Sequence, residues 1–275
     1  MTRTNTSNSS ARFLTKNAVT FADVCAVPVP PKEGTYNPVA YRDAIEFLKH
    51  EATATIGASI ARESYGLNKA GDQMFGTLAL DMGRADDGLA IGFRQSYNKS
   101  LALGVAIGAQ VFVCDNLCFS ASGAGSFKVV RKNTTNVWAD FLTLVRRQLK
   151  GATAQYGQTI LECDSMKSIP CEVDRGYSIL GVMQGRGLLT PNQASVAFGD
   201  WQAPRRHAEF DRRDVWGLYN AVTQGLKKGP AARTMERHAS AHRFFVEELS
   251  GAAVDAEPVT VRQSDGSTAE IVRAN

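Results

Sequence analysis

The sequence predicts an α+β fold: a curved antiparallel β-meander flanked by helices, with a mostly helical C-terminal part. Two observations carry this prediction. Between residues 75 and 132, short apolar runs alternate with turn-forming residues, which is typical of consecutive antiparallel strands. Before and after this region, apolar residues recur at helical spacing behind capping residues. With 44% hydrophobic residues among 275, the chain is long enough to bury one such core.

The two ends of the chain differ in composition from its middle. The first residues are polar and low in complexity, and residues 25–38 are rich in proline and turn formers. The last residues are acidic and contain Asp265-Gly266, which fits either a small hairpin or a loose tail. We therefore divide the chain into a disordered or linker-like N-terminus (residues 1–35), a main α+β domain (residues 36–250, with its core at 75–150 and a helical part at 190–250) and an acidic C-terminal tail or small hairpin (residues 251–275).

The first predicted helix runs from about Pro38 to His50. Asn37 can serve as its N-cap, and Pro38 suits the first helical position because an N–H there would have no partner. The following residues 52–66 are compatible with either a continued helix or an extended segment. The apolar face of this helix consists of Tyr41, Ala44, Ile45 and Leu48.

A β-hairpin is predicted next. Residues 75–82 and 88–97 are two apolar runs, and the turn-like segment 83–87 separates them. Because Asp-Gly is a frequent turn dipeptide, Asp87-Gly88 is expected to close the hairpin.

The meander continues into a long helix. Residues 101–114 form a strand with large apolar side chains on one face and glycine and alanine on the other, and residues 127–132 give a further strand. Thr134 or Thr135 can cap the helix that follows, and Gly151 ends it. Its apolar stripe consists of Val137, Trp138, Phe141, Val145 and Leu149, with Arg147 and Lys150 on the opposite side.

The C-terminal half alternates between weak and strong helical patterns. Residues 163–176 read as a loop. Three helices are predicted after it: one beginning near Thr190-Pro191, one capped by Asp214 with Trp216, Tyr219, Val222 and Leu226 on one face, and one from about Arg233 to Leu249.

Composition and charge favour a cytoplasmic protein with an anionic partner. No apolar run has the length of a signal peptide or membrane span, and the five cysteines are expected to be reduced thiols. Residues 128–150 hold six basic residues against one acid, residues 201–243 hold nine against four, and residues 244–275 hold two against six. The basic segments are either solvated faces or the binding surface for a polyanion from which the tail stays away.

Two basic groups are the candidates for contacts with nucleic acid. A sequence-neutral single-strand binder holds phosphates with lysine and arginine and meets bases by stacking. The alternative is a solvated surface with Trp138 in the core. The first group consists of Lys128, Arg131, Lys132, Arg146 and Arg147 around the strand-to-helix junction, with Arg94, Tyr97, Lys99 and Trp138 nearby in sequence; the second consists of Arg205, Arg206, His207, Arg212 and Arg213.

The sequence contains no clear catalytic signature. Cys114, Cys118, His238 and His242 could in principle supply four zinc ligands. However, a free cysteine at a strand end behaves as a small hydrophobe, and the two histidines fit half-buried helix positions. The aspartates of segment 81–87 are too few convergent carboxylates to favour a metal-dependent nuclease. We therefore expect a non-enzymatic protein without a cofactor or a resident metal.

Three segments carry a family resemblance: SYNKSLALGVAIGAQVFVCDNLCFS (residues 96–120), RKNTTNVWADF (131–141) and DVWGLYNAVTQGLKK (214–228). Together they resemble the phage/plasmid-like proteins of domain of unknown function 932, over residues 75–228. This family brings no established activity, but its genes lie on prophages and plasmids beside genes of DNA processing and anti-restriction. The order of helix, β-meander and long basic helix is also similar to the core of single-strand annealing proteins of the RecT, Red beta and Erf kind.

These observations lead to the expectation of a mobile-element protein that binds or anneals single-stranded DNA without catalysis, as a homo-oligomer. The alternative is a protein-interaction module, such as an anti-defence or regulatory factor, that binds a host protein through the helix of Trp216 and Tyr219. The two differ in salt dependence, because phosphate contacts release counterions and an aromatic protein interface does not.

Overall fold

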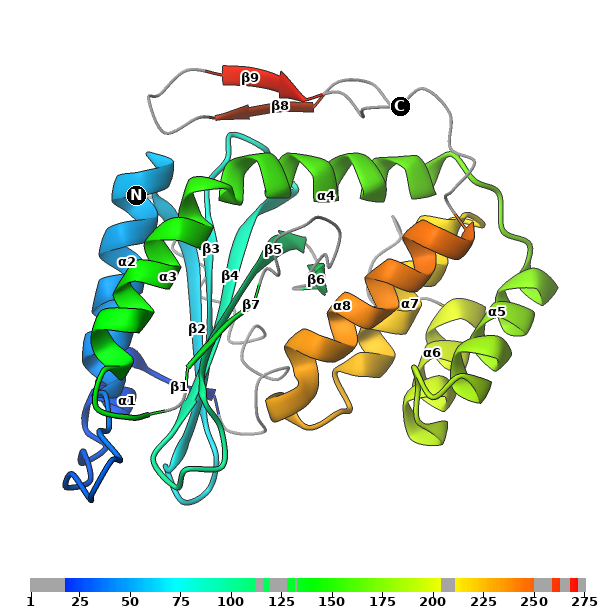
Figure 1. The fold of residues 1–275 in the computed structure, drawn as a ribbon. Coiled ribbons are helices and arrows are strands. Elements are labelled where there is room, and N and C mark those ends of the chain that lie inside the picture. The colour runs from blue at the N-terminus through cyan, green and yellow to red at the C-terminus, as the bar shows by residue number, and fades with distance from the viewer. Residues whose placement is uncertain are drawn as a thin grey trace, which may run out of the picture.

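The computed structural model describes residues 18–111, 116–118, 128–131, 133–203, 211–249, 259–262 and 268–271. It confirms the α+β class (Figure 1). A sheet stands between two layers of helices, with α2 and α3 on one side and α7 and α8 on the other. Helix α4 runs along one end of the sheet and reaches the second layer, and α5 and α6 lie outermost. None of the described helices has both the length and the apolar composition needed to cross a membrane.

The centre of the sheet is an antiparallel meander of β2 (Ile60–Leu67), β3 (Gln73–Leu80), β4 (Asp87–Ser96) and β5 (Leu103–Val111). The short β1 (Ala18–Val19) extends it beside β2. At the other edge, β6 (Asn116–Cys118) and β7 (Lys128–Arg131) both pair with β5, the first near its C-terminal end and the second near its N-terminal end. The predicted meander is therefore confirmed.

The turn of the β3–β4 hairpin differs from the prediction. Asp87 does not form the turn, because it is the first residue of β4 and is buried. The turn instead uses Gly83, whose φ of 78° lies in the left-handed region that favours glycine. The Gly83 amide donates a hydrogen bond to Asp81 Oδ1 at 2.8 Å, which fixes the turn.

Helix α2 (Tyr41–Ile56) begins three residues later than predicted and ends six residues later. Its N-cap is Ala40, and Asn37 instead donates its backbone and side-chain N–H groups to the carbonyls of Asn133 and Thr135. The ambiguous segment 52–66 is divided between the end of α2 and strand β2. Gly57, with φ of 72°, provides the left-handed residue that ends the helix.

Helix α3 (Val137–Lys150) matches the predicted long helix. Its buried stripe consists of Val137, Phe141, Val145 and Leu149, as the spacing predicts. The predicted caps are wrong: the N-cap is Asn136, and neither Thr134 nor Thr135 provides a side-chain cap. Burial of the stripe against α2 and the sheet thus defines this helix more strongly than its cap does.

The largest difference from the prediction lies after α3. Residues 163–176 are not a loop, because α4 (Ala152–Lys167) and α5 (Val173–Gly185) occupy most of this range. Several polar residues of α4 are buried, Thr159, Glu162 and Ser165 among them, so the helix has no clean apolar stripe. It packs against both β5 and α7, which explains burial on more than one side.

The other helices agree with the sequence. Helix α6 (Pro191–Gln202) starts with a capping box of Thr190 and Gln193, and Asp214 caps α7 (Val215–Leu226) through a 2.8 Å bond from the Gly217 amide. The remaining elements are α1 (Phe21–Cys25), the 3₁₀ turn η3 (Ala231–Arg233), α8 (Thr234–Phe244), the π-helical turn η4 (Phe245–Leu249) and the hairpin of β8 (Val259–Arg262) and β9 (Thr268–Ile271).

Candidate nucleic-acid interface

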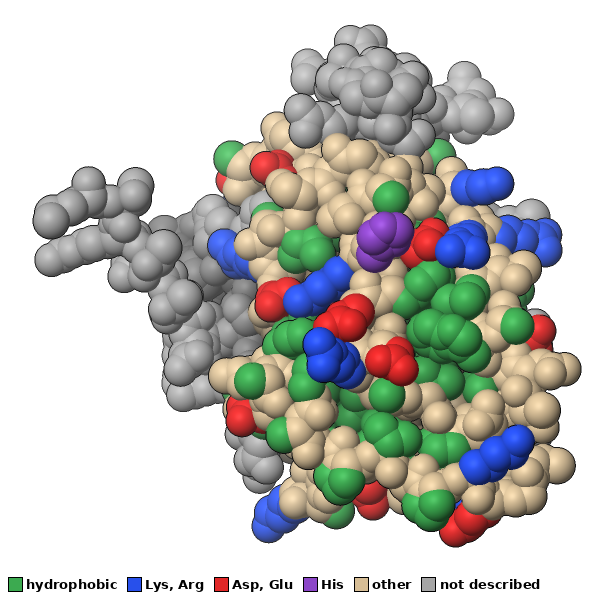
Figure 2. Space-filling model, turned by 90° about the vertical axis from the view of Figure 1, so that its left-hand side faces the viewer, with side chains coloured by type: hydrophobic (Ala, Val, Ile, Leu, Met, Phe, Trp, Pro, Cys, Tyr) green, Lys and Arg blue, Asp and Glu red, His purple; other side chains and the backbone are tan. Residues whose placement is uncertain are grey.

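An aromatic cluster joins α2 to α3 on the outer side of the molecule. The ring of Phe47 on α2 lies 5.6 Å from Trp138 and 6.0 Å from Phe141, both on α3. Phe141 is buried, whereas Phe47 and Trp138 are half-buried. Hydrophobic side chains accordingly gather on this face among charged ones (Figure 2). Half-exposed rings give such a surface flat π faces that a base or an apolar side chain could cover.

Arg146 links the aromatic cluster to a carboxylate. Its guanidinium carbon lies 5.6 Å from the centre of the Phe47 ring, and its Nη2 donates to Glu51 Oε1 at 2.6 Å. The Arg146 side chain is 55% exposed, while that of Glu51 is only 12% exposed. This hydrogen bond holds the pKa of the Glu51 carboxyl below its ordinary value.

Two further cations occupy the last turn of α3. Arg147 and Lys150 are exposed, and neither makes an ion pair with a described side chain. Cations at a helix C-terminus also stabilise the helix dipole, so their position has a structural explanation as well. We call Phe47, Trp138, Arg146, Arg147 and Lys150 together the seam surface.

The basic residues of β7 do not extend the seam surface in a simple way. The register pairs Arg131 with Leu103 and Lys128 with Ala106. Leu103 belongs to the main core below α2 and α3, whereas Ala106 packs with Met235 on the opposite face of the sheet. The side chains of Lys128 and Arg131, and the whole of Lys132, lie outside the described part of the structure.

Arg94 is buried within the fold and is not available for a phosphate. Its guanidinium donates to both carboxylate oxygens of Glu236, at 2.7 and 3.0 Å, and to the carbonyl of Ala232. Only 9% of the side chain is exposed. Tyr97 is buried too, because its ring stacks on Tyr41 with centroids 3.8 Å apart. The expectation that Arg94 and Tyr97 serve a binding surface is therefore wrong.

Lys99 lies at the other end of α3 from Arg146. It occupies the turn between β4 and β5 with φ of 64°, and its Nζ is 2.7 Å from a Glu33 carboxylate oxygen and 4.7 Å from the centre of the Tyr36 ring. The Tyr36 hydroxyl donates to the Tyr97 carbonyl, which anchors this cluster to β4. Lys99 is thus half-exposed but already paired, and it is not part of the seam surface.

The second basic group lies mostly outside the described residues, which exclude Arg205, Arg206 and His207. Arg212 pairs with Asp214 at 2.5 Å. Arg213 lies with its guanidinium carbon 4.9 Å from the Trp201 ring centre and donates to the Trp201 carbonyl at 2.6 Å. These two arginines therefore fix the end of α6 against the start of α7.

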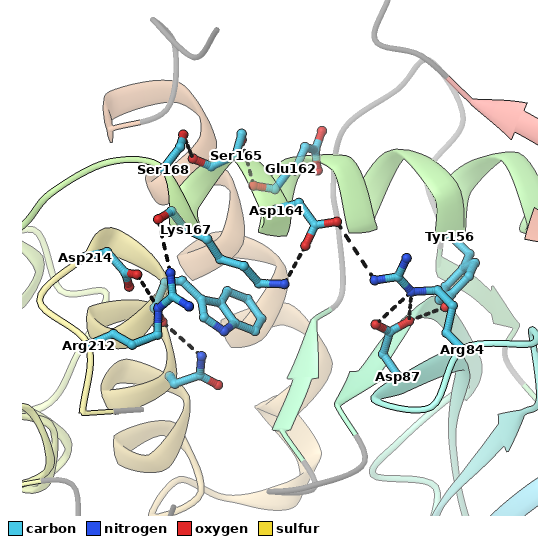
Figure 3. Close-up of polar contacts among 12 residues, drawn as sticks. Arg84, Asp87, Tyr156, Glu162, Asp164, Ser165, Lys167, Ser168, Arg212 and Asp214 are labelled. Atoms are coloured by element: carbon cyan, nitrogen blue, oxygen red, sulfur yellow. Dashed lines mark hydrogen bonds and ion pairs between the residues drawn. The ribbon is translucent and has the colours of Figure 1, made fainter. Parts of the chain in front are cut away.

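Sequence reasoning missed a chain of charged groups between the sheet and the helices (Figure 3). The Arg84 Nε donates to both carboxylate oxygens of Asp87 at 3.1 Å, and its Nη2 lies 3.9 Å from Asp164. Lys167 pairs with Asp164 at 2.5 Å, and the Tyr156 hydroxyl donates to Asp87. Burial raises the pKa of Tyr156, so it remains a neutral donor. Each charged group lies near a group of opposite charge, and this series of ion pairs fastens α4 to the β3–β4 turn.

The two histidines of α8 are fully buried, rather than half-buried as expected. His242 Nε2 lies 2.8 Å from Glu162 Oε2, and its Nδ1 lies 3.2 Å from the Tyr219 hydroxyl. His238 Nδ1 lies 2.6 Å from the carbonyl of Leu117, and burial lowers the pKa of His238 to about 4.

These contacts bear on the zinc hypothesis. Both ring nitrogens of His242 are engaged, by Glu162 and Tyr219. Within the described side chains, no three histidine, cysteine, aspartate or glutamate residues gather in a group that could hold a metal ion. Cys114 and the side chain of Cys118 lie outside that part.

The aromatic residues of α7 are also buried. Trp216 is 7% exposed and Tyr219 is 0% exposed, because α7 is enclosed by α4, α6 and α8. A host protein could not contact these rings without opening the fold. The expectation of a partner surface on Trp216 and Tyr219 is therefore wrong.

Comparisons of the chain with protein-family models, curated proteins and solved structures give no match. The geometry of the chain itself is what identifies the seam surface as the candidate interface.

Proposed function

We propose that this chain binds single-stranded DNA without catalysis through the seam surface. One observation carries the proposal: the half-exposed rings of Phe47 and Trp138 lie against each other, the exposed Arg146 lies beside Phe47, and Arg147 and Lys150 follow in the last turn of α3. A sequence-neutral binder needs these two components, since every base has a π face and every nucleotide has a phosphate.

The size of the seam surface sets what it can bind. Arg146, Arg147 and Lys150 lie within about one helical turn, or about 6 Å along the axis. That distance matches two or three phosphates of a single strand. Each neutralised phosphate of a single strand contributes about −0.7 to the slope of log affinity against log salt, so we expect a slope of roughly −2 from these residues.

The resemblance described above supports a role on a phage or plasmid, in the cytoplasm, in the annealing of complementary strands. The order of α2, the β2–β5 meander and α3 follows the helix, meander and basic helix on which that resemblance rests. Because one copy offers few cations, useful affinity would require several copies on one strand, where the linked contacts act together. A homo-oligomer is therefore part of the proposal.

The test is fluorescence anisotropy of a labelled single-stranded oligonucleotide at low and high salt, with a duplex of the same length beside it. We expect binding that prefers the single strand and weakens as salt rises. Absence of binding at low salt would overturn the proposal. Binding whose affinity did not change with salt would instead indicate an apolar contact, and it would favour a protein partner on this face.

A pair of double variants locates the site. R147A/K150A removes two cations of the seam surface that make no ion pair with a described side chain, and we expect a salt slope smaller by about 1.4. The matched control is K228A/R243A, which removes two exposed cations at α7 and α8 that make no ion pair with a described side chain. Equal loss of binding in both variants would show that net charge, rather than the seam surface, determines affinity.

A further inference from the structure

The contact between Arg146 and Glu51 gives the seam surface an internal competitor for phosphate. The proposal below rests on the proposed function and concerns how the same site is regulated. Glu51 is a mostly buried carboxylate on α2, and its oxygen takes one nitrogen of a guanidinium that is otherwise exposed. Carboxylate and phosphate oxygens bind guanidinium in the same way, so Glu51 occupies Arg146 as a phosphate would.

Arg146 uses only part of its hydrogen-bonding capacity within the described structure. Glu51 accepts from Nη2 alone, and neither Nε nor Nη1 donates a hydrogen bond to a described residue. The ring of Phe47 lies 5.6 Å from the guanidinium carbon, which fixes the side chain beside the helix surface. A phosphate could therefore approach the free edge of Arg146, and it would then lie close to the negative charge of Glu51.

Two effects of Glu51 oppose each other. Its hydrogen bond orients Arg146, which favours binding, while its charge repels a phosphate at the same guanidinium, which disfavours binding. The charge remains at neutral pH, because Arg146 lowers the pKa of Glu51. Phe47 also restrains Arg146, so the orienting effect of Glu51 is partly redundant. The charge of Glu51 faces Arg146 of α3 at 2.6 Å and, on α2, only the exposed imidazole of His50 at 3.9 Å among the described ion pairs.

We propose that Glu51 is an autoinhibitory residue of the seam surface: it holds Arg146 in an internal ion pair and lowers affinity for single-stranded DNA. Binding exchanges the Glu51 contact of Arg146 for a phosphate contact. Affinity is thereby limited, and a single copy releases its strand readily.

The variant E51Q separates charge from hydrogen bonding, because glutamine keeps the acceptor oxygen for Arg146 and loses the negative charge. Repulsion between two charges about 5 Å apart, screened almost as in bulk water because Arg146 is exposed, corresponds to about a fivefold change in affinity at low salt, and added salt screens it further. We expect E51Q to bind a labelled oligothymidine about fivefold more tightly than the unmodified chain, with a smaller gain at high salt.

The matched control is E46Q, which removes the same charge from the same helix. Glu46 pairs with Arg42 at 2.9 Å, well exposed and apart from the aromatic cluster. A second control is the comparison of R146A with E51Q/R146A, since the gain from E51Q should vanish without Arg146. Thermal melting of each variant shows that the fold is retained.

The outcomes distinguish this inference from the proposed function. Binding by the unmodified chain with a gain in E51Q alone, dependent on Arg146, supports both. Binding by the unmodified chain with equal affinity in E51Q and E46Q, or with weaker binding in E51Q, overturns the role of Glu51 and leaves the proposed function standing. A gain that persists in E51Q/R146A also overturns it. Absence of binding by every variant at low salt overturns the proposed function itself.

Discussion

The seam surface and the packing of α4, α7 and α8 contain similar side chains in opposite situations. In the helical packing, the buried His242 contacts the buried Glu162 through one ring nitrogen and the buried Tyr219 through the other. On the seam surface, Arg147 and Lys150 are exposed and make no ion pair with a described side chain. Charged and aromatic residues therefore indicate a binding role only where the fold leaves their bonding capacity unused, which the seam surface does and the helical packing does not.

The strongest test of this comparison removes His242. In H242A, the buried Oε2 of Glu162 loses its partner, and an uncompensated buried polar or charged group costs about 3 kcal/mol of unfolding free energy. Chemical denaturation would measure that loss. Single-strand binding per folded molecule should not change, since His242 lies in the helical packing. If H242A were as stable as the unmodified chain, the two regions would not differ as described.

Acidification should act on the helical packing as well. Burial lowers the pKa of His238 from 6.5 to about 4. Between these values the unfolded chain binds the proton and the folded chain does not, so stability is complete above about pH 6.5 and falls as pH drops towards 4. The total loss is about 3 kcal/mol. We expect denaturation curves between pH 7 and 5 to show about 2 kcal/mol of this loss.

The control for the pH dependence uses His50, which is exposed, in place of the buried His238. H238Q should flatten the decline between pH 6.5 and 5, whereas H50Q should leave it unchanged, because the His50 side chain is 80% exposed. A decline of equal steepness in H238Q would assign the pH dependence to other groups.

A third test sharpens the role of the aromatic cluster. W138A removes a half-buried ring of the seam surface, and Y177A removes a half-buried ring that packs on Phe198, 5.8 Å away between α5 and α6. Both should cost about 1 kcal/mol of stability, because a comparable aromatic contact is lost. W138A alone should weaken single-strand binding about tenfold, the effect of one lost base stack. Similar affinities for the two variants would contradict base stacking on Trp138.

The sequence was sufficient for the elements whose pattern is local. Strand alternation identified β3, β4 and β5, and the caps Thr190 and Asp214 identified the starts of α6 and α7. Asn37 and Asp87 were misassigned for the same reason: each has a local turn or cap propensity, but each is used in a contact with residues far along the chain. Local rules carry no information on such contacts.

The missed helices and the misplaced site residue share a second cause. Helix α4 is enclosed on several sides, and some of its buried residues are polar. Its sequence therefore lacks the single apolar stripe by which an amphipathic helix is recognised. Arg94 is expected to be exposed when one face of the sheet is assumed to be open to solvent. In the structure, α8 covers that face and supplies Glu236. Arg146 and Arg147 were identifiable, because α3 does have one buried and one exposed side. Glu51 was not, because its role depends on the packing of two helices.

The pair of Arg94 and Glu236 also has a consequence for how the chain folds during synthesis. The two residues are 142 positions apart. The meander can form from local pairings as soon as β5 has left the ribosome, but the guanidinium in its centre has no carboxylate until α8 has been made. A nascent or truncated chain that ends before Glu236 would expose one face of the sheet with an uncompensated charge. The C-terminal helices are therefore the part of the chain that completes the sheet, and their loss would turn a folded protein into one that needs chaperones.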